Sequence, residues 1–153
     1  MKTVLEDIAV RLCSGDYKNE EHVRAAIVNR LLQQLGWDIW NPLEVHPEFS
    51  PIRSEDSTRV DIAVFLPPQH LRPAIFIEVK TVGKLATNLE MAERQLRDYN
   101  RNNQAEISVL TDGQFWRFYW AGAAGEFRQK CFEEINLIEP GASFDEIENI
   151  FTT

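Results

Sequence analysis

Two short apolar runs near the middle of the chain constrain its fold more than any other feature. Residues 59–66 (RVDIAVFL) and 74–80 (AIFIEVK) are rich in β-branched residues and have the length of β-strands. The connection at 67–73 is rich in proline and too short for a helical crossover, so the two runs are expected to form one antiparallel hairpin. Both runs also carry acidic residues, which a core strand should lack.

The register of this hairpin brings the acidic residues together. If the first strand ends at Leu66 and the second resumes at Pro73, Asp61 faces Glu78. Because side chains alternate across a strand, Asp61, Glu78 and Lys80 share one face, and the other face is an apolar core surface. Facing carboxylates lie roughly 5 Å apart at Cβ, and their repulsion costs about 3 kcal/mol at an effective dielectric constant of about 20. Either Lys80 or a divalent cation such as Mg²⁺ is expected to offset that repulsion.

A cluster of ion pairs without a metal is the alternative interpretation of these charges. The triplet Glu78-Val79-Lys80 taken alone favours it, because such triplets are frequent on solvated strands. Both strands are otherwise too apolar to be solvated, however, and the register independently brings Asp61 to the same place. The pattern therefore predicts a metal-dependent phosphodiester site.

The spacing of these residues resembles the PD-(D/E)xK nuclease superfamily. Asp61 is followed, after sixteen residues, by Glu78-Val79-Lys80, although Val60 stands where the motif's name has Pro. The segment Gln95-x-x-x-Tyr99 resembles the QxxxY element of RecB-like nucleases.

Two further segments extend the resemblance to the N-terminal nuclease domain of type I restriction R (motor) subunits. They are an acidic helix start that leads to a Leu-Gly-Trp turn at 19–37, and a hairpin at 110–119. This resemblance implies an α/β restriction-endonuclease-like core, in which a central mixed β-sheet is flanked by helices on both faces. It also implies a Mg²⁺-dependent endonuclease that hydrolyses DNA phosphodiesters.

The family implies which residues hold the metal. Asp61, Glu78 and the Val79 carbonyl would bind one or two Mg²⁺ or Mn²⁺ ions, which polarise the phosphate and activate the attacking water. The helix glutamate of the family aligns best with Glu20, as a further metal ligand, although Glu21 is an alternative. Both glutamates also suit the first turn of a helix, where the helix dipole favours carboxylates, so a purely structural role is open for each.

The remaining site residues are expected to act on the substrate. Lys80 would orient the water or stabilise the transition-state charge. Gln95 and Tyr99 would position the substrate or Lys80, while Gln95 alone could equally satisfy a buried backbone group. Their helix is expected to begin at a capping box formed by Thr87 and Glu90.

Basic residues are candidates for phosphate contacts. Arg24, Arg59 and Lys84 lie closest in sequence to the predicted site. Residues Arg94, Arg97 and Arg101 form a stripe on the Gln95 helix, opposite its packed face, and are interpreted as a solvated helix surface.

The net charge of −8 argues against tight DNA binding by the chain alone, because phosphate neutralisation supplies most non-specific affinity. A motor or specificity subunit, a second copy or an absent fused domain would then be needed for tight DNA binding. The sequence has no P-loop motif, so no ATP-driven motor is expected in this chain. An alternative function is a catalytically silent nuclease-fold module that binds DNA or a partner in a larger restriction or repair assembly.

The length of the chain and the lack of a linker or internal repeat predict a single domain over residues 1–153. Helices are expected over 4–12, 20–35 and 87–99 and from 143 onward, and a surface loop at 50–58. Further strands are expected at 43–49, 106–110, 114–120 and 127–132. No membrane-spanning run or secretory signal is visible, and the two cysteines lack metal-ligand spacing, so a soluble cytoplasmic protein is expected.

Overall fold

The computed structural model of the chain describes residues 1–50, 59–66, 72–103, 105–139 and 143–152. Several helical segments precede the first strand, one long helix interrupts the series of strands, and a last helix follows them. In chain order the elements are α1 (Lys2–Cys13), α2 (Glu20–Val23), the π-helical turn η1 (Arg24–Val28), α3 (Asn29–Gln34), β1 (Val45–Phe49), β2 (Val60–Val64), β3 (Ile75–Val79), α4 (Lys84–Asn103), β4 (Ile107–Thr111), β5 (Phe115–Trp120), the 3₁₀ turn η3 (Phe127–Lys130), β6 (Cys131–Asn136) and α5 (Phe144–Thr152).

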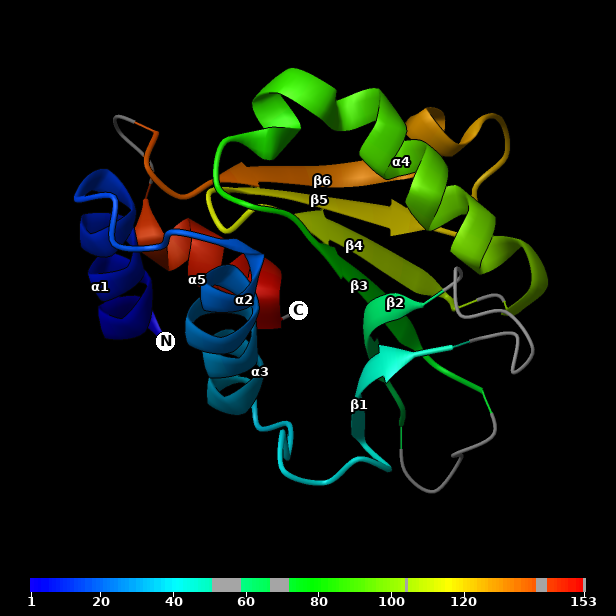
Figure 1. Cartoon of the computed structure of the whole chain (residues 1–153), viewed down its shortest axis with the longest axis horizontal. Coiled ribbons are helices and arrows are strands. Elements are labelled where there is room, and N and C mark those ends of the chain that lie inside the picture. The colour runs from blue at the N-terminus through cyan, green and yellow to red at the C-terminus, as the bar shows by residue number, and fades with distance from the viewer. Residues whose placement is uncertain (51–58, 67–71, 104, 140–142, 153) are drawn as a thin grey trace.

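The six strands form one mixed sheet in the order β1-β2-β3-β4-β5-β6. Strands β3 and β4 are parallel and are joined by α4, because a parallel pair needs a crossover connection; the other pairs are antiparallel. Helix α4 covers one face of the sheet, whereas α1, α2, α3 and α5 lie on the other (Figure 1). The predicted fold class, a mixed sheet with helices on both faces, is confirmed.

The predicted register of the central hairpin is also confirmed. Strands β2 and β3 pair through Ile62 with Ile77, Ala63 with Phe76, and Val64 with Ile75. The next facing positions in this register are Asp61 and Glu78. The two carboxylates therefore come from neighbouring strands at the same level of the sheet.

The burial of the hairpin differs from expectation on one point. The face that carries the charges is itself a core surface, because α4 packs on it: Ala63 and Phe76 are fully buried together with Leu96 of α4. Val60, expected on the opposite face with Ile62, belongs to this α4 cluster. The charged residues thus lie at the end of a buried face, so they are more dehydrated than a half-exposed hairpin would make them.

Several element boundaries shift from their predicted positions. The last strand begins at Cys131, because 127–130 forms a 3₁₀ turn capped reciprocally by Glu126 and Gln129. Helix α4 begins at Lys84 and kinks at Asn88, so the expected capping box at Thr87 is not its start; the Thr87 hydroxyl instead donates to the Lys84 carbonyl.

The other helices lie close to the expected ranges, and 20–34 is continuous through the π turn. Most of the expected loop at 50–58 lies outside the described residues. None of the described helices is long and apolar enough to cross a lipid bilayer.

Candidate active site

The predicted site residues come from four elements that meet at the carboxyl end of β3. Asp61 is on β2, Glu78 is on β3, and Lys80 directly follows β3. Glu20 opens α2, and α4 contributes Gln95. Hydrogen bonds join the β2, β3 and α4 residues of this set, whereas Glu20 is linked to Asp61 and Lys80 through its charge.

Asp61 is tied to the neighbouring strand through its side chain. Its Oδ2 accepts a hydrogen bond of 2.7 Å from the Val79 backbone N–H. Burial raises the pKa of the Asp61 carboxyl, while that hydrogen bond and the charges of Lys80 and Arg24 oppose the rise. The bond leaves the second carboxylate oxygen, Oδ1, available to a ligand.

Glu78 is the most perturbed carboxylate of the site. It is only 2 % exposed, and its Oε1 accepts a hydrogen bond of 2.7 Å from Lys80 Nζ. Its Oε2 is buried without a hydrogen-bond partner among the described residues. Burial, followed by the charge of Asp61, raises the pKa of Glu78 to about 7 despite Lys80. A buried acceptor without a donor is costly, so this oxygen calls for a partner that the described residues do not supply.

Lys80 is held between two partners. Besides Glu78, its Nζ donates to Gln95 Oε1 at 2.9 Å, and Gln95 Nε2 in turn donates to the Tyr99 hydroxyl. Burial and the charge of Glu78 raise the pKa of Tyr99 to about 12, so this hydroxyl stays protonated. The QxxxY pair is therefore placed to orient the lysine ammonium group.

The two helix glutamates, Glu20 and Glu21, differ in their surroundings. Glu21 forms an ion pair with Arg24 on the helix surface. The pKa of Glu20 is raised, first by partial desolvation and next by the charge of Asp61. Asn19 caps this helix by accepting a hydrogen bond of 2.9 Å from the His22 N–H. Glu20 is thus the glutamate that lies electrostatically closest to the site.

A further acidic residue, Glu48, was not anticipated from the sequence. It lies on β1 between the partners of Ile62 and Val60, and therefore opposite Asp61. Its backbone has a φ of +49°, which is unusual for a residue with a side chain. The negative charge of Glu48 helps to raise the pKa of Asp61. The only sequence signal for it would have been the register of β1 on β2.

The predicted phosphate-binding residues are placed unequally. Arg24 and Arg59 lie beside the site, and each has a guanidinium nitrogen 3.7 Å from a carboxylate oxygen of Glu48. Lys84 begins α4 and is exposed. Two arginines and Glu48 therefore border the Asp61 side of the site.

The residues present fit a hard divalent cation. Mg²⁺ prefers oxygen ligands and is often held by one or two carboxylates together with waters and substrate phosphates. Asp61 and Glu78 supply two carboxylates from facing positions, and Glu78 Oε2 has no donor among the described residues. Within the described ranges, no three His, Cys, Asp or Glu side chains are grouped to hold a metal by themselves. A metal here would therefore rely on backbone, water or substrate oxygens for the rest of its ligands.

Comparisons with known proteins agree with this architecture. The structure is similar to a solved structure described as "Characterization and crystal structure of the type IIG restriction endonuclease BpuSI", with a TM-score of 0.50 and 14 % sequence identity. The similarity covers 85 % of this chain and 15 % of the other, so this chain spans only a small part of that protein. At this identity the likeness shows the fold alone. No curated protein matches the chain.

A family model defines the relationship more closely. The model described as "Type I restriction enzyme R protein N terminus (HSDR_N)" matches residues 19–136, which is more than half of the chain. The matched range includes the hairpin, the Glu20 helix and the QxxxY helix. The chain therefore belongs to the family of type I restriction enzyme R protein N-terminal domains.

Proposed function

We propose that this chain hydrolyses DNA phosphodiester bonds as a Mg²⁺-dependent endonuclease. The observation that carries the proposal is the buried Glu78 carboxylate, which faces Asp61, has one oxygen without a donor, and contacts a lysine through the other. In a purely structural ion-pair cluster both carboxylate oxygens usually have hydrogen-bond partners. Family membership and the restriction-endonuclease fold support the same chemistry.

Asp61 and Glu78 would hold the ion, with the Val79 carbonyl between them in sequence. When bound, Mg²⁺ supplies a Lewis acid for the phosphate and lowers the pKa of a coordinated water. Glu20 would approach as a ligand to a second ion or through a water molecule. Its raised pKa, caused partly by the charge of Asp61, is consistent with such proximity.

Lys80 would act on the phosphate. In the absence of a cation its ammonium group neutralises Glu78. With a divalent cation at Glu78, Lys80 would be able to turn its ammonium group to a phosphate oxygen and stabilise the charge that develops there. Gln95, oriented by the Tyr99 hydroxyl, would remain a hydrogen-bond partner of Nζ and limit how far the ammonium group turns.

The test is cleavage of supercoiled and linear DNA with Mg²⁺ or Mn²⁺, combined with calorimetric metal titration. We expect Asp61→Ala, Glu78→Ala and Lys80→Ala each to abolish cleavage with folding intact. Glu20→Gln and Glu21→Gln form a matched pair on one helix turn, and only the first should lower the rate. Absence of both metal binding and cleavage of every DNA form would refute the proposal for this chain.

A second candidate function is a silent nuclease-fold module within a larger assembly. The net charge of −8 favours it, because an acidic surface opposes independent DNA binding. We propose a motor subunit, a specificity subunit or a second copy as the partner. Recovery of such a partner, together with DNA cleavage by the assembly that survives Asp61→Ala, would select this function over catalysis.

A further inference from the structure

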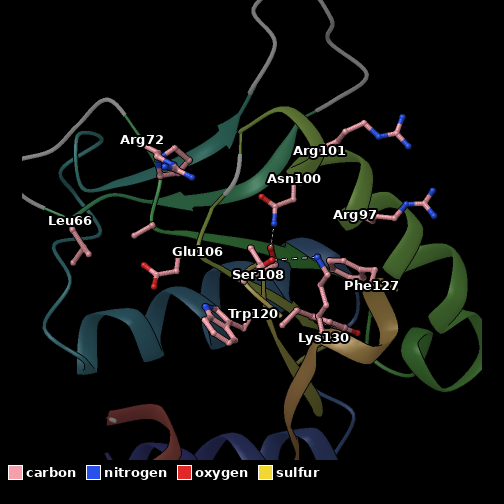
Figure 2. A pocket seen from close by; sticks show the side chains of 15 residues that line it. Leu66, Arg72, Arg97, Asn100, Arg101, Glu106, Ser108, Trp120, Phe127 and Lys130 are labelled. Atoms are coloured by element: carbon pink, nitrogen blue, oxygen red, sulfur yellow. Dashed lines mark hydrogen bonds between the residues drawn. The ribbon is translucent and has the colours of Figure 1, made fainter. Parts of the chain in front are cut away.

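A cavity of about 760 Å³, whose lining side chains are drawn in Figure 2, lies beside the residues that lead into β3, whereas the candidate active site is at the other end of that strand. It is bounded by the segment before β3, the start of β4, the end of β5, the last turns of α4, and η3. Ser108 on β4 lines it and pairs with Phe76, whereas Leu110, two residues further, pairs with Glu78. The cavity and the carboxylates therefore lie at two levels of the same strand pair.

The cavity is strongly basic. Among the described residues, its lining includes Arg72, Arg97, Arg101 and Lys130, against a single acidic residue, Glu106. This concentration of positive charge occurs in a chain whose net charge is −8. Clefts lined by one sign of charge attract ligands of the opposite sign, so the ligand expected here is an anion.

The arginines of α4 are available to such an anion. Arg101 forms no ion pair with any residue in the described ranges. Arg97 pairs at 3.0 Å with its neighbour Asp98, and both side chains are about half exposed, so this pair is worth little. The two arginines are one helical turn apart, and both side chains extend from α4 in one direction, away from Trp120, so they lie at the rim of the cavity (Figure 2). The interpretation of this stripe as a solvated surface is correct for exposure but misses the cavity.

An aromatic ring lines the same cavity. Trp120 is 48 % exposed, although it ends a strand of a well-packed sheet. Its indole packs against Gly122, where an added Cβ would lie 2.7 Å from the ring. Glycine at this position therefore allows the ring to be held in place rather than to swing freely. An exposed, positioned aromatic beside basic residues is typical of sites that stack nucleic-acid bases.

We propose that this cavity binds an unpaired stretch of a DNA strand, with a base on Trp120 and adjoining phosphates at Arg97, Arg101 and Lys130. A paired base is already stacked within its duplex and cannot enter a cavity in this way. The inference rests on the proposed cleavage of DNA and adds a substrate class, namely DNA with a single-stranded stretch.

Helix α4 connects the cavity to the candidate active site. Gln95 contacts Lys80, and Arg101 lies six residues further along, roughly 9 Å along the helix axis. A strand anchored at the cavity therefore has the adjoining phosphates within reach of the carboxylates. DNA with an overhang or a flap is accordingly the preferred substrate.

The test is fluorescence anisotropy of labelled oligo-dT, about 12 nucleotides long, in EDTA and low salt, with blunt duplex as the comparison. Trp120→Ala should weaken oligo-dT binding about tenfold, and Trp120→Phe should restore most of it. Arg101→Ala should reduce the slope of log K against log salt concentration by about 0.7, the value for one phosphate contact on a single strand. Arg94→Ala is the matched control, because Arg94 lies on the same helix stripe, is 63 % exposed and does not line the cavity.

The outcomes separate this inference from the proposed function, because the binding assay contains no divalent metal. Unchanged oligo-dT binding by Trp120→Ala and Arg101→Ala, or no saturable binding by the wild type, would overturn the inference while leaving cleavage untouched. Loss of binding in these variants, without cleavage under any condition, would support the cavity and count against the nuclease. If Trp120→Ala does not fold, the salt slope of Arg101→Ala decides the question.

Discussion

The buried Glu78 carboxylate should make the metal-free protein less stable as the pH rises. In the folded state its pKa is raised from 4.5 to about 7, chiefly by burial. The unfolded chain therefore loses this proton first, and stability is lost as the pH rises from about 4.5 to about 7. At 1.36 kcal/mol per pKa unit, the full loss is about 3 kcal/mol. This net effect already includes the favourable contact with Lys80.

Glu78→Gln removes the titrating group and preserves its shape. In EDTA at about pH 8 the variant should be more stable than the wild type by up to about 3 kcal/mol, and the difference should vanish near pH 4. The assay is urea unfolding across this pH range, with the midpoint read at a constant m-value.

Glu93→Gln provides a control with the opposite sign. Glu93 is also buried, at 4 % exposure, but it accepts hydrogen bonds from the Tyr119 hydroxyl and from Arg128 at 3.1 and 2.9 Å. Its replacement should destabilise the protein by about 1–3 kcal/mol, because charged hydrogen bonds are lost. A Glu78→Gln variant that is less stable at pH 8, or whose pH profile matches the wild type, would refute the reasoning.

Three further outcomes follow from the same contacts. Mg²⁺ should bind more tightly as the pH rises from about 5 to about 8 and should release a proton on binding, because Glu78 must be ionised to ligate it. Calorimetry in two buffers of different ionisation enthalpy measures the released proton. A metal affinity that does not change with pH would contradict this prediction. Gln95→Leu should slow DNA cleavage about 10-fold or more with unchanged metal affinity, because Lys80 Nζ loses an acceptor at 2.9 Å. Arg94→Leu, on the exposed side of the same helix, should not slow cleavage. Equal cleavage rates for the two variants would count against a positioning role for Gln95. Gly113→Ala should lower stability in thermal unfolding by about 1–3 kcal/mol more than Gly36→Ala. Both glycines have a positive φ, but only a Cβ at position 113 would meet another side chain, Ile27 Cδ1, at 2.7 Å. Equal losses of stability in the two variants would show that the packing around Gly113 relaxes.

The central hairpin could be predicted because its constraints are local. The connection at 67–73 limits the register, and strand alternation then assigns Asp61, Glu78 and Lys80 to one face. The same alternation could not show that α4 buries that face. Covering a face depends on how a distant helix returns over the sheet, which no local pattern records.

Other features depended on contacts between distant segments. Glu48 reaches Asp61 only through the pairing of β1 with β2, and its left-handed backbone has no sequence signature. The start of the last strand was predicted four residues too early, because the reciprocal capping of Glu126 and Gln129 begins a 3₁₀ turn that occupies 127–130. The basic cavity combines residues of the segment before β3 with residues of β4, β5, α4 and η3, so the α4 arginines alone resembled an ordinary solvated surface.

A crystal structure with Mn²⁺ tests the central claim most directly. We expect one anomalous peak between Asp61 and Glu78, at about 2.0–2.2 Å from a carboxylate oxygen of each and from the Val79 carbonyl, close to the distances of Mg²⁺ sites. The ion should take Glu78 Oε2, the oxygen that is buried without a partner. An empty position there at saturating Mn²⁺, with Lys80 still paired to Glu78, would contradict the account.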